Sequence, residues 1–261
     1  MSVPAPVEIW GLPLAPLRLD EAADAAIALA RGGAPSFLVT ANAHYAMLAE
    51  RRPELRALNR RAAMVLADGA PLVWASRLAG RPLPERVAGS DLIYGLAERA
   101  AAAGLPVYFL GGAPGVAAQA VERLAARCPG LRVVGVESPP FRPLSPQEQA
   151  EQLGRIRAAA PAILVLALTM PAGELWLGEH LAAAGVPLGV NLGASLDFVA
   201  GRVRRAPPWM QRSGLEWFYR FAQEPRRLGG RYLRNGRYVL ARLAGTLAGR
   251  ALGRRPSGAS P

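Results

Sequence analysis

The stretch Val107-Tyr108-Phe109-Leu110-Gly111-Gly112-Ala113-Pro114-Gly115 indicates the fold most directly. Its first four residues are apolar at every position, which is typical of a strand that is buried on both faces. The glycine-rich loop leads into an alanine-rich stretch that ends near Arg127 and is predicted to be a helix. A buried strand that is followed at once by a helix is the repeating unit of a parallel sheet.

The same unit recurs along the first 201 residues, where short apolar runs alternate with stretches rich in Ala, Leu, Arg and Glu. We predict strands at residues 37–40, 64–67, 107–110, 131–135, 163–167 and 188–191. We predict helices at residues 20–31, 43–61, 91–103, 115–127, 145–159 and 173–184. Ser145 and Glu148 form a capping-box pattern at the start of one of them. The predicted fold class is therefore α/β, with a Rossmann-like parallel sheet covered by helices on both faces.

Charge divides the chain into two parts. The 261 residues carry a net charge of +12, and 51% of them are hydrophobic, so a core can form. Residues 202–261 hold 14 arginines and two acids, whereas the first 201 residues hold 17 of each. The whole positive excess therefore lies in the C-terminal segment, which suggests binding to a polyanion: anionic lipid, nucleic acid or a phosphorylated substrate.

We accordingly predict three regions: a Rossmann-like catalytic core over 1–201, a basic and aromatic helical appendage over 202–252, and a disordered tail over 253–261. Ala206-Pro207-Pro208 interrupts the chain near the first boundary, and aromatic residues alternate with arginines beyond it. Arginines mixed with Trp, Tyr and Phe are typical of a membrane interface. No apolar run is long enough to span a bilayer, and the first ten residues do not resemble a signal peptide, so we expect a cytoplasmic protein.

Metal and disulfide chemistry are not expected. The chain has one cysteine and two histidines, which excludes an intrachain disulfide and argues against a Cys/His metal cage. It also has no Asp-x-Asp sequence, the usual carboxylate clamp for a metal–diphosphate.

The ends of the predicted strands carry the candidate site residues, because ligands of open α/β sheets bind beyond the carboxyl ends of the strands. Asp68 follows a buried run and suits a general base, or else a helix cap or turn. Thr40 and Asn42 suit sugar hydroxyls but also turns. Gly111 and Gly112 allow a phosphate to approach the backbone, or form an ordinary tight turn. Arg86 suits a phosphate or a surface ion pair.

Taken together, the motifs resemble the WecG/TagA/CpsF family of glycosyltransferases over about residues 9–238. The most specific block is Arg204-Arg205-Ala206-Pro207-Pro208-Trp209-Met210-Gln211-Arg212-Ser213-Gly214-Leu215-Glu216-Trp217-Phe218-Tyr219-Arg220. The others are Thr40-Ala41-Asn42, Ala67-Asp68-Gly69, Arg86-Val87-Ala88-Gly89-Ser90-Asp91 and Phe109-Leu110-Gly111-Gly112.

The resemblance implies an inverting, metal-independent glycosyltransferase without a cofactor. It would move a sugar from a UDP-sugar to a polyprenyl-diphosphate-linked sugar at the inner face of the cytoplasmic membrane. The product would belong to a capsule, exopolysaccharide or cell-wall polymer. The partners implied are the nucleotide-sugar, the lipid-linked acceptor and an anionic membrane surface, without nucleic acid; self-association is left open.

Carried over residue by residue, the resemblance makes Asp68 the base that deprotonates the acceptor hydroxyl. Thr40 and Asn42 would contact the sugars, Arg86 the phosphates, and Gly111 and Gly112 the nucleotide. The departing diphosphate would be neutralised by arginines of the appendage: Arg220, Arg226, Arg227 and Arg231.

One segment departs from the family pattern. Where the family usually reads Gly-x-Pro-Lys-Gln-Glu, this chain reads Thr169-Met170-Pro171-Ala172-Gly173-Glu174. The lost ammonium and amide would have made hydrogen bonds that select a sugar, so donors of the N-acetylmannosamine, glucose and glucuronic acid types all stay open. Glu174 is interpreted either as a sugar ligand or as a first-turn helix acid.

Three other functions compete with this interpretation. A nucleic-acid-binding protein would explain the basic segment but not the polar strand ends. A Rossmann oxidoreductase would need a complete Gly-x-Gly-x-x-Gly loop in the first strand–helix unit. A catalytically altered homologue would explain the unusual segment at Gly173.

Overall fold

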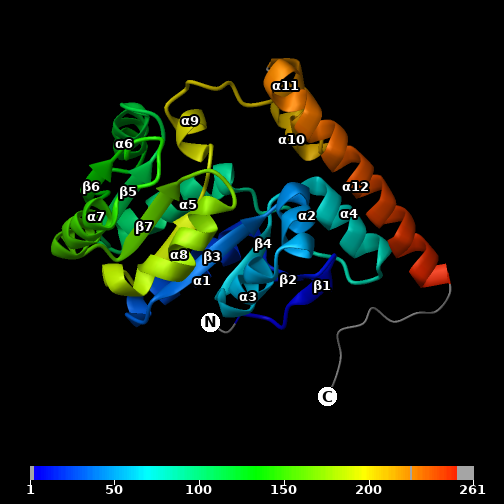
Figure 1. The fold of residues 1–261 in the computed structure, drawn as a ribbon, viewed down its shortest axis with the longest axis horizontal. Helices are drawn as coiled ribbons and strands as arrows, with labels where there is room; N and C mark the ends of the chain where they lie inside the picture. The colour runs from blue at the N-terminus through cyan, green and yellow to red at the C-terminus, as the bar shows by residue number, and fades with distance from the viewer. Residues whose placement is uncertain (1–2, 224, 252–261) are drawn as a thin grey trace.

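The computed structural model describes residues 3–223 and 225–251. Its centre is an eight-stranded sheet in the order β1-β2-β4-β3-β8-β7-β5-β6 (Figure 1). All neighbouring strands are parallel except β1 and β2. The strands are β1 (Val7–Ile9), β2 (Leu12–Leu14), β3 (Ser36–Ala41), β4 (Met64–Ala67), β5 (Val107–Gly111), β6 (Val133–Glu137), β7 (Ile163–Ala167) and β8 (Leu188–Asn191).

Helices cover both faces of the sheet, as predicted. The first nine are α1 (Leu19–Gly32), α2 (Ala43–Arg51), α3 (Pro53–Arg61), α4 (Ala70–Leu78), α5 (Gly89–Ala102), α6 (Val116–Arg127), α7 (Pro146–Ala159), α8 (Ala172–Ala184) and α9 (Ser195–Val199). One core lies between the sheet and α1, α5, α6 and α9, and the other between the sheet and α2, α3, α4, α7 and α8. Successive strand residues such as Tyr108 and Phe109 enter opposite cores, which explains why the strands are apolar at every position.

The sheet is mostly parallel, as predicted, and it also has an antiparallel hairpin at one edge. Val7–Ile9 and Leu12–Leu14 form this hairpin. Its two-residue turn is Trp10-Gly11, and both residues have positive φ, as a type I′ hairpin turn requires. The sequence-based reading missed this hairpin because each strand has only three residues.

Some helices and one strand also differ from the sequence-based prediction. The single helix expected over 43–61 is two helices, because Pro53 disfavours helical geometry at Arg52 and starts a new helix. Helix α4 was not predicted. Strand β6 lies two residues later than expected. The capping box of α7 is confirmed: Ser145 Oγ accepts from the N–H of Glu148, and the Glu148 carboxylate accepts from the N–H of Ser145.

Three further helices follow the sheet: α10 (Pro208–Arg212), α11 (Glu216–Gln223) and α12 (Pro225–Ala251). Figure 1 shows α12 running along the outside of the molecule beside α4 and α2, and contacts between these helices are numerous. Arg242 of α12 pairs with Glu50 of α2 at 2.7 Å, and Tyr238 packs edge-on against Trp10 of the hairpin turn. The boundary at residue 201 stays a prediction, and the tail over 253–261 lies outside the described residues.

Candidate active site

The polar residues at the ends of β3, β4 and β8 come together at one edge of the sheet. This follows from the strand order, in which β4, β3 and β8 are neighbours and parallel. Thr40 Oγ1 donates to the backbone oxygen of Asn191 at 3.3 Å, and the N–H of Asp68 donates to the oxygen of Ala41 at 2.7 Å. The carboxyl end of the sheet thus forms a fixed polar floor.

Asp68 directly follows β4, on the β4 side of this floor, and the residue is half-buried. Burial raises the pKa of its carboxyl to about 6, while the Arg86 guanidinium and a hydrogen bond from the backbone of Gly89 lower it. Glu216 and Asp91 add smaller contributions that raise it. A carboxylate with a pKa just below neutrality is both ionised and basic at pH 7, which suits a general base.

Asn42 directly precedes α2 and caps it. Its Oδ1 accepts from the backbone N–H of Tyr45 at 3.1 Å. A Cβ added to Gly69, the residue after Asp68, would lie 3.6 Å from the Cβ of Asn42. Asn42 therefore makes the helix-capping hydrogen bond that is typical of a turn residue. It also lies next to the loop that carries Asp68.

Glu174 is buried, with 1% of its surface exposed. Its Oε1 accepts from the amide nitrogen of Asn191 at 3.0 Å, and its Oε2 has no hydrogen-bond partner among the residues that the structure describes. Burial raises the pKa of this carboxyl to about 7. The Oδ1 of Asn191 accepts from the N–H of Leu168 at 3.1 Å. Asn191 therefore ties α8, the end of β7 and the Thr40 strand to one another.

The two glycines at the end of β5 approach the end of β7 closely. Gly111 has a φ of +122°, and a Cβ there would lie 2.7 Å from the backbone oxygen of Ala167. The N–H of Gly112 already donates to that oxygen at 3.0 Å. Glycine at 111 is thus required by strand packing, and strands β8 and β7 separate this loop from β3 in the sheet.

The predicted phosphate-binding arginines have different surroundings. Arg86 is paired with Glu216 at 2.7 Å and with Asp91 at 3.5 Å. Arg220 of α11 lies over the ring of Phe198 of α9, with 5.1 Å between the guanidinium carbon and the ring centre, so it stands near the end of β8. Arg226 is exposed at the start of α12. The side chains of Arg227 and Arg231 lie outside the described part of the chain.

Sequence reasoning assigned no role to several residues that the structure places here. Asp91, Arg205 and Glu216 form ion pairs around Arg86, and Asn191 joins three strand ends. Asp91, Arg205 and Glu216 all belong to the motif blocks quoted above. Their presence in these motif blocks was the available signal for a role, but it did not indicate which of the charged side chains form ion pairs.

The sequence of almost the whole chain matches a known protein family. Residues 7–252 match the profile described as the glycosyl transferase WecG/TagA/CpsF family. The chain belongs to this family. It is 33% identical over 192 residues to an N-acetylglucosaminyldiphosphoundecaprenol N-acetyl-beta-D-mannosaminyltransferase of Bacillus spizizenii, and the alignment covers 74% of this chain and 73% of that protein. The resemblance inferred from the motifs is confirmed, and the protein is a glycosyltransferase.

The unusual glycine of this glycosyltransferase has a physical reason. A Cβ on Gly173 would lie 2.3 Å from the side-chain amide carbon and nitrogen of Asn191. That amide is held by Leu168 and Glu174, so it has no free direction in which to move. In this chain the amide of Asn191 occupies the space that a side chain at position 173 would need.

Gly173→Ala is therefore expected to lower the free energy of unfolding by about 2–4 kcal/mol, because displacing Asn191 leaves Glu174 and the N–H of Leu168 without hydrogen bonds. Urea unfolding measures this change. Gly154→Ala is the matched control, since a Cβ on Gly154 of α7 meets no atom within 4 Å and alanine favours a helix. Equal stability of the two variants would contradict the prediction.

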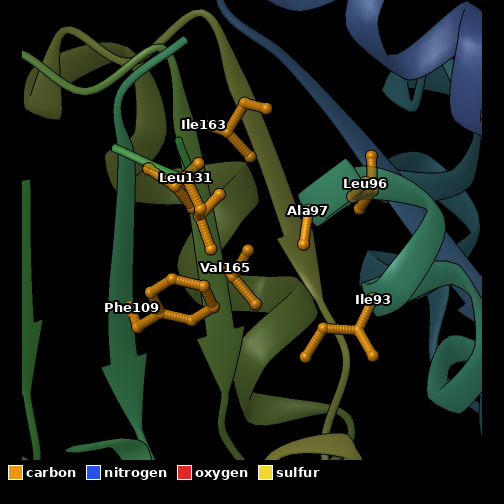
Figure 2. Close-up of a pocket in the computed structure, with 8 residues that line it drawn as sticks. Ile93, Leu96, Ala97, Phe109, Leu131, Ile163 and Val165 are labelled. Atoms are coloured by element: carbon orange, nitrogen blue, oxygen red, sulfur yellow. The ribbon is translucent and has the colours of Figure 1, made fainter. Parts of the chain in front are cut away.

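The enclosed cavity of the core is not the active site. It lies between α5 and strands β5 and β7, has a volume of about 10 Å³, and is lined by apolar side chains (Figure 2). Figure 2 shows Ile93, Leu96 and Ala97 of α5 facing Phe109, Ile163 and Val165 of the sheet. A site for a sugar nucleotide needs a volume of hundreds of cubic ångströms and polar groups. The strand ends, unlike this void, offer polar groups for such a site.

Proposed function

We propose that the protein transfers a sugar from a UDP-sugar to a sugar carried on polyprenyl diphosphate, with inversion at the anomeric carbon. The reaction takes place at the inner face of the cytoplasmic membrane and contributes to a cell-envelope polysaccharide. The Bacillus spizizenii relative supports the lipid-linked acceptor, since it is an N-acetylglucosaminyldiphosphoundecaprenol N-acetyl-beta-D-mannosaminyltransferase.

Asp68 carries the proposal. Its carboxylate accepts the proton of the acceptor hydroxyl, the oxygen of that hydroxyl bonds to the anomeric carbon, and the bond from that carbon to the diphosphate breaks. UDP leaves with the electron pair. The location of Asp68 at the end of β4 and its pKa of about 6 suit this step, since the group is ionised at pH 7 yet basic enough to take up a proton. Thr40, beside it on β3, donates to the neighbouring strand and helps to fix the floor on which the sugars lie.

Arginines supply the positive charge for the leaving diphosphate in this proposal. Arg220 stands against α9 at the end of β8, and Arg226, Arg227 and Arg231 follow at the start of α12. Fixed cations near a developing negative charge lower the barrier without reorganising. We propose that these arginines take the place of a metal ion at the diphosphate, so that the reaction needs none.

The outer face of α10–α12 meets the membrane in this proposal. None of the helices in the described ranges is both long and apolar enough to cross a bilayer. Yet Trp209, Trp217 and Phe218 are about half exposed. Leu233, Leu240 and Leu247 of α12 are exposed at intervals of seven residues and so share one helix face, opposite the Tyr238 and Arg242 side chains that contact the rest of the protein. Exposed aromatic and leucine side chains among arginines suit an anionic lipid surface.

The test uses purified protein, anionic vesicles that contain a polyprenyl-diphosphate-linked sugar, and UDP-sugars of the N-acetylmannosamine, glucose and glucuronic acid types. We expect UDP release with one donor, dependent on the acceptor and unchanged by EDTA, and a product with inverted anomeric configuration by NMR. Release that EDTA abolishes would contradict metal independence. No release with any donor, in protein that still binds the vesicles, would favour the catalytically altered homologue.

A further inference from the structure

The side-chain amide of Asn191 lies where a side chain on residue 173 would begin. A Cβ on Gly173 would lie 2.3 Å from both the amide carbon and the amide nitrogen of Asn191, and 2.6 Å from its Oδ1. The family usually has a glutamine at position 173, and therefore an amide on α8. In this chain an amide fills the same space from the sheet, at the end of β8.

Asn191 holds the loop between β7 and α8. Its Oδ1 accepts from the N–H of Leu168, the first residue of this loop, at 3.1 Å. Its Nδ2 donates to Oε1 of Glu174, in the first turn of α8, at 3.0 Å. One amide group therefore ties both ends of the loop to β8, and the position of residues 168–172 depends on it.

The same junction has a hydrogen-bonding atom that the fold does not use. Asn191 and Glu174 are buried, with 2% and 1% of their surface exposed. Oε2 of Glu174 has no partner among the described residues. Unpaired polar atoms are rare in protein interiors, and an apolar pair of the same shape would avoid their cost. The polar pair therefore indicates a role beyond holding the fold together.

The loop that Asn191 holds lies within reach of a sugar donor that reacts at Asp68. The exposed residues of this loop are Thr169 and Ala172. The strand order β4-β3-β8-β7 places the end of β7 three strand spacings, about 14 Å, from the end of β4. A hexose joined through a diphosphate to a nucleoside is long enough to bridge this distance. The exposed side of the loop is therefore available to the sugar of the donor.

We propose that Asn191 is a positioning residue that determines which donor sugar this enzyme selects, and that it supplies from β8 the amide that the family usually has on α8. Asn191 acts through the backbone of residues 168–172, whose exposed residues meet the sugar. A glutamine at 173 and an asparagine at 191 exclude each other, because both amides need the same space. The change at Gly173 is then a relocation of the amide and not a loss of function. The inference rests on the proposed use of a UDP-sugar donor.

The test is the affinity of the purified protein for UDP and for UDP-sugars of the N-acetylmannosamine, glucose and glucuronic acid types, measured by calorimetry without an acceptor. We expect Asn191→Ala to raise the Kd of the preferred UDP-sugar at least tenfold and that of UDP less than threefold, because only the sugar contacts depend on the loop. Gln152→Ala is the matched control, since Gln152 is a buried amide of α7 that bonds to the Glu137 carboxylate. It should leave the ratio of the two constants unchanged. Equal loss of affinity for UDP and UDP-sugar in Asn191→Ala would overturn the proposal.

The double variant Asn191→Gly/Gly173→Gln returns the amide to α8. We expect it to bind the preferred UDP-sugar within threefold of wild type, whereas Gly173→Gln alone should bind it at least tenfold more weakly, since its side chain meets Asn191. A double variant that regains the wild-type free energy of unfolding but not the sugar affinity would overturn the relocation.

Binding requires no transfer, so this inference and the proposed function fail separately. A wild type that binds one UDP-sugar more tightly than UDP, yet releases no UDP with any acceptor, would contradict the proposed reaction alone. A wild type that binds all the UDP-sugars no more tightly than UDP would overturn sugar selection through Asn191.

Discussion

Asp68→Asn is expected to reduce kcat for sugar transfer by about 10²–10⁴-fold, the usual contribution of a positioned general base. Asparagine keeps the size and the hydrogen-bond acceptor that faces the backbone of Gly89, but it cannot take up a proton. The wild-type kcat/KM should rise with pH through a limb near pH 6, because Asp68 must be ionised to act. That limb should be absent from the residual activity of the variant.

The free energy of unfolding shows whether the Asp68→Asn variant is correctly folded. The folded protein raises the pKa of Asp68 from the ordinary value near 3.8 to about 6, so the folded state binds this proton more tightly than the unfolded state. The contribution of Asp68 to stability is therefore greatest at low pH and falls as the pH rises from about 4 to about 6. At pH 7.5 the asparagine variant should have a free energy of unfolding equal to or above that of wild type.

Asp24→Asn is the matched substitution, because Asp24 is an exposed carboxylate of α1 that pairs with Arg99. It should leave kcat and the pH profile unchanged. An Asp68→Asn variant that folds and retains more than a tenth of the wild-type kcat would exclude Asp68 as the base.

The sequence predicted the central sheet well because buried parallel strands carry a strong local signal. The ranges 107–110 and 163–167 are apolar throughout and are bounded by glycine, proline or a helix. The parts that were missed have weak local signals. The β1–β2 hairpin has three-residue strands, and α4 begins with Ala70-Pro71 directly after the Asp68 loop, where a turn was equally plausible.

The residues of the candidate site also include some that the sequence predicted and some that it could not predict. Thr40 lies at the end of its strand and Asp68 directly follows its strand, so the rule for open α/β sheets placed them together, and the structure brings them to one end of the sheet. The contacts of Arg86 could not be predicted, because its partner Glu216 lies 130 residues away and the sequence offers many acids. Nor could the sequence explain Gly173, since the reason is the amide of Asn191 on a neighbouring strand.

Membrane binding is expected to depend on the arginines of α12. Arg226, Arg234 and Arg237 are exposed, and two of them share the helix face of Leu233 and Leu240. Each cation near an anionic surface contributes about 1 kcal/mol, so replacing all three with glutamine should cost about 3 kcal/mol. The partition coefficient onto anionic vesicles should therefore fall by about 10²-fold in a sedimentation assay, and the remaining binding should be less sensitive to salt.

The control for this variant must change the net charge by the same amount elsewhere on the surface. Arg31, Arg60 and Arg132 are exposed on α1, on α3 and in the segment before β6, so replacing these three with glutamine tests net charge alone. If both triple variants lose binding equally, the vesicles sense only the overall charge, and α12 is not the membrane face. If the wild type binds oligonucleotides more tightly than vesicles, the basic segment serves nucleic acid and the membrane proposal fails. Selective loss in the α12 variant would identify this helix as the membrane face. Because Arg226 is also proposed to act on the leaving diphosphate, UDP release from a detergent-dispersed acceptor is measured in the double variant Arg234→Gln/Arg237→Gln. Wild-type release in that variant would separate membrane binding from the chemistry at Asp68.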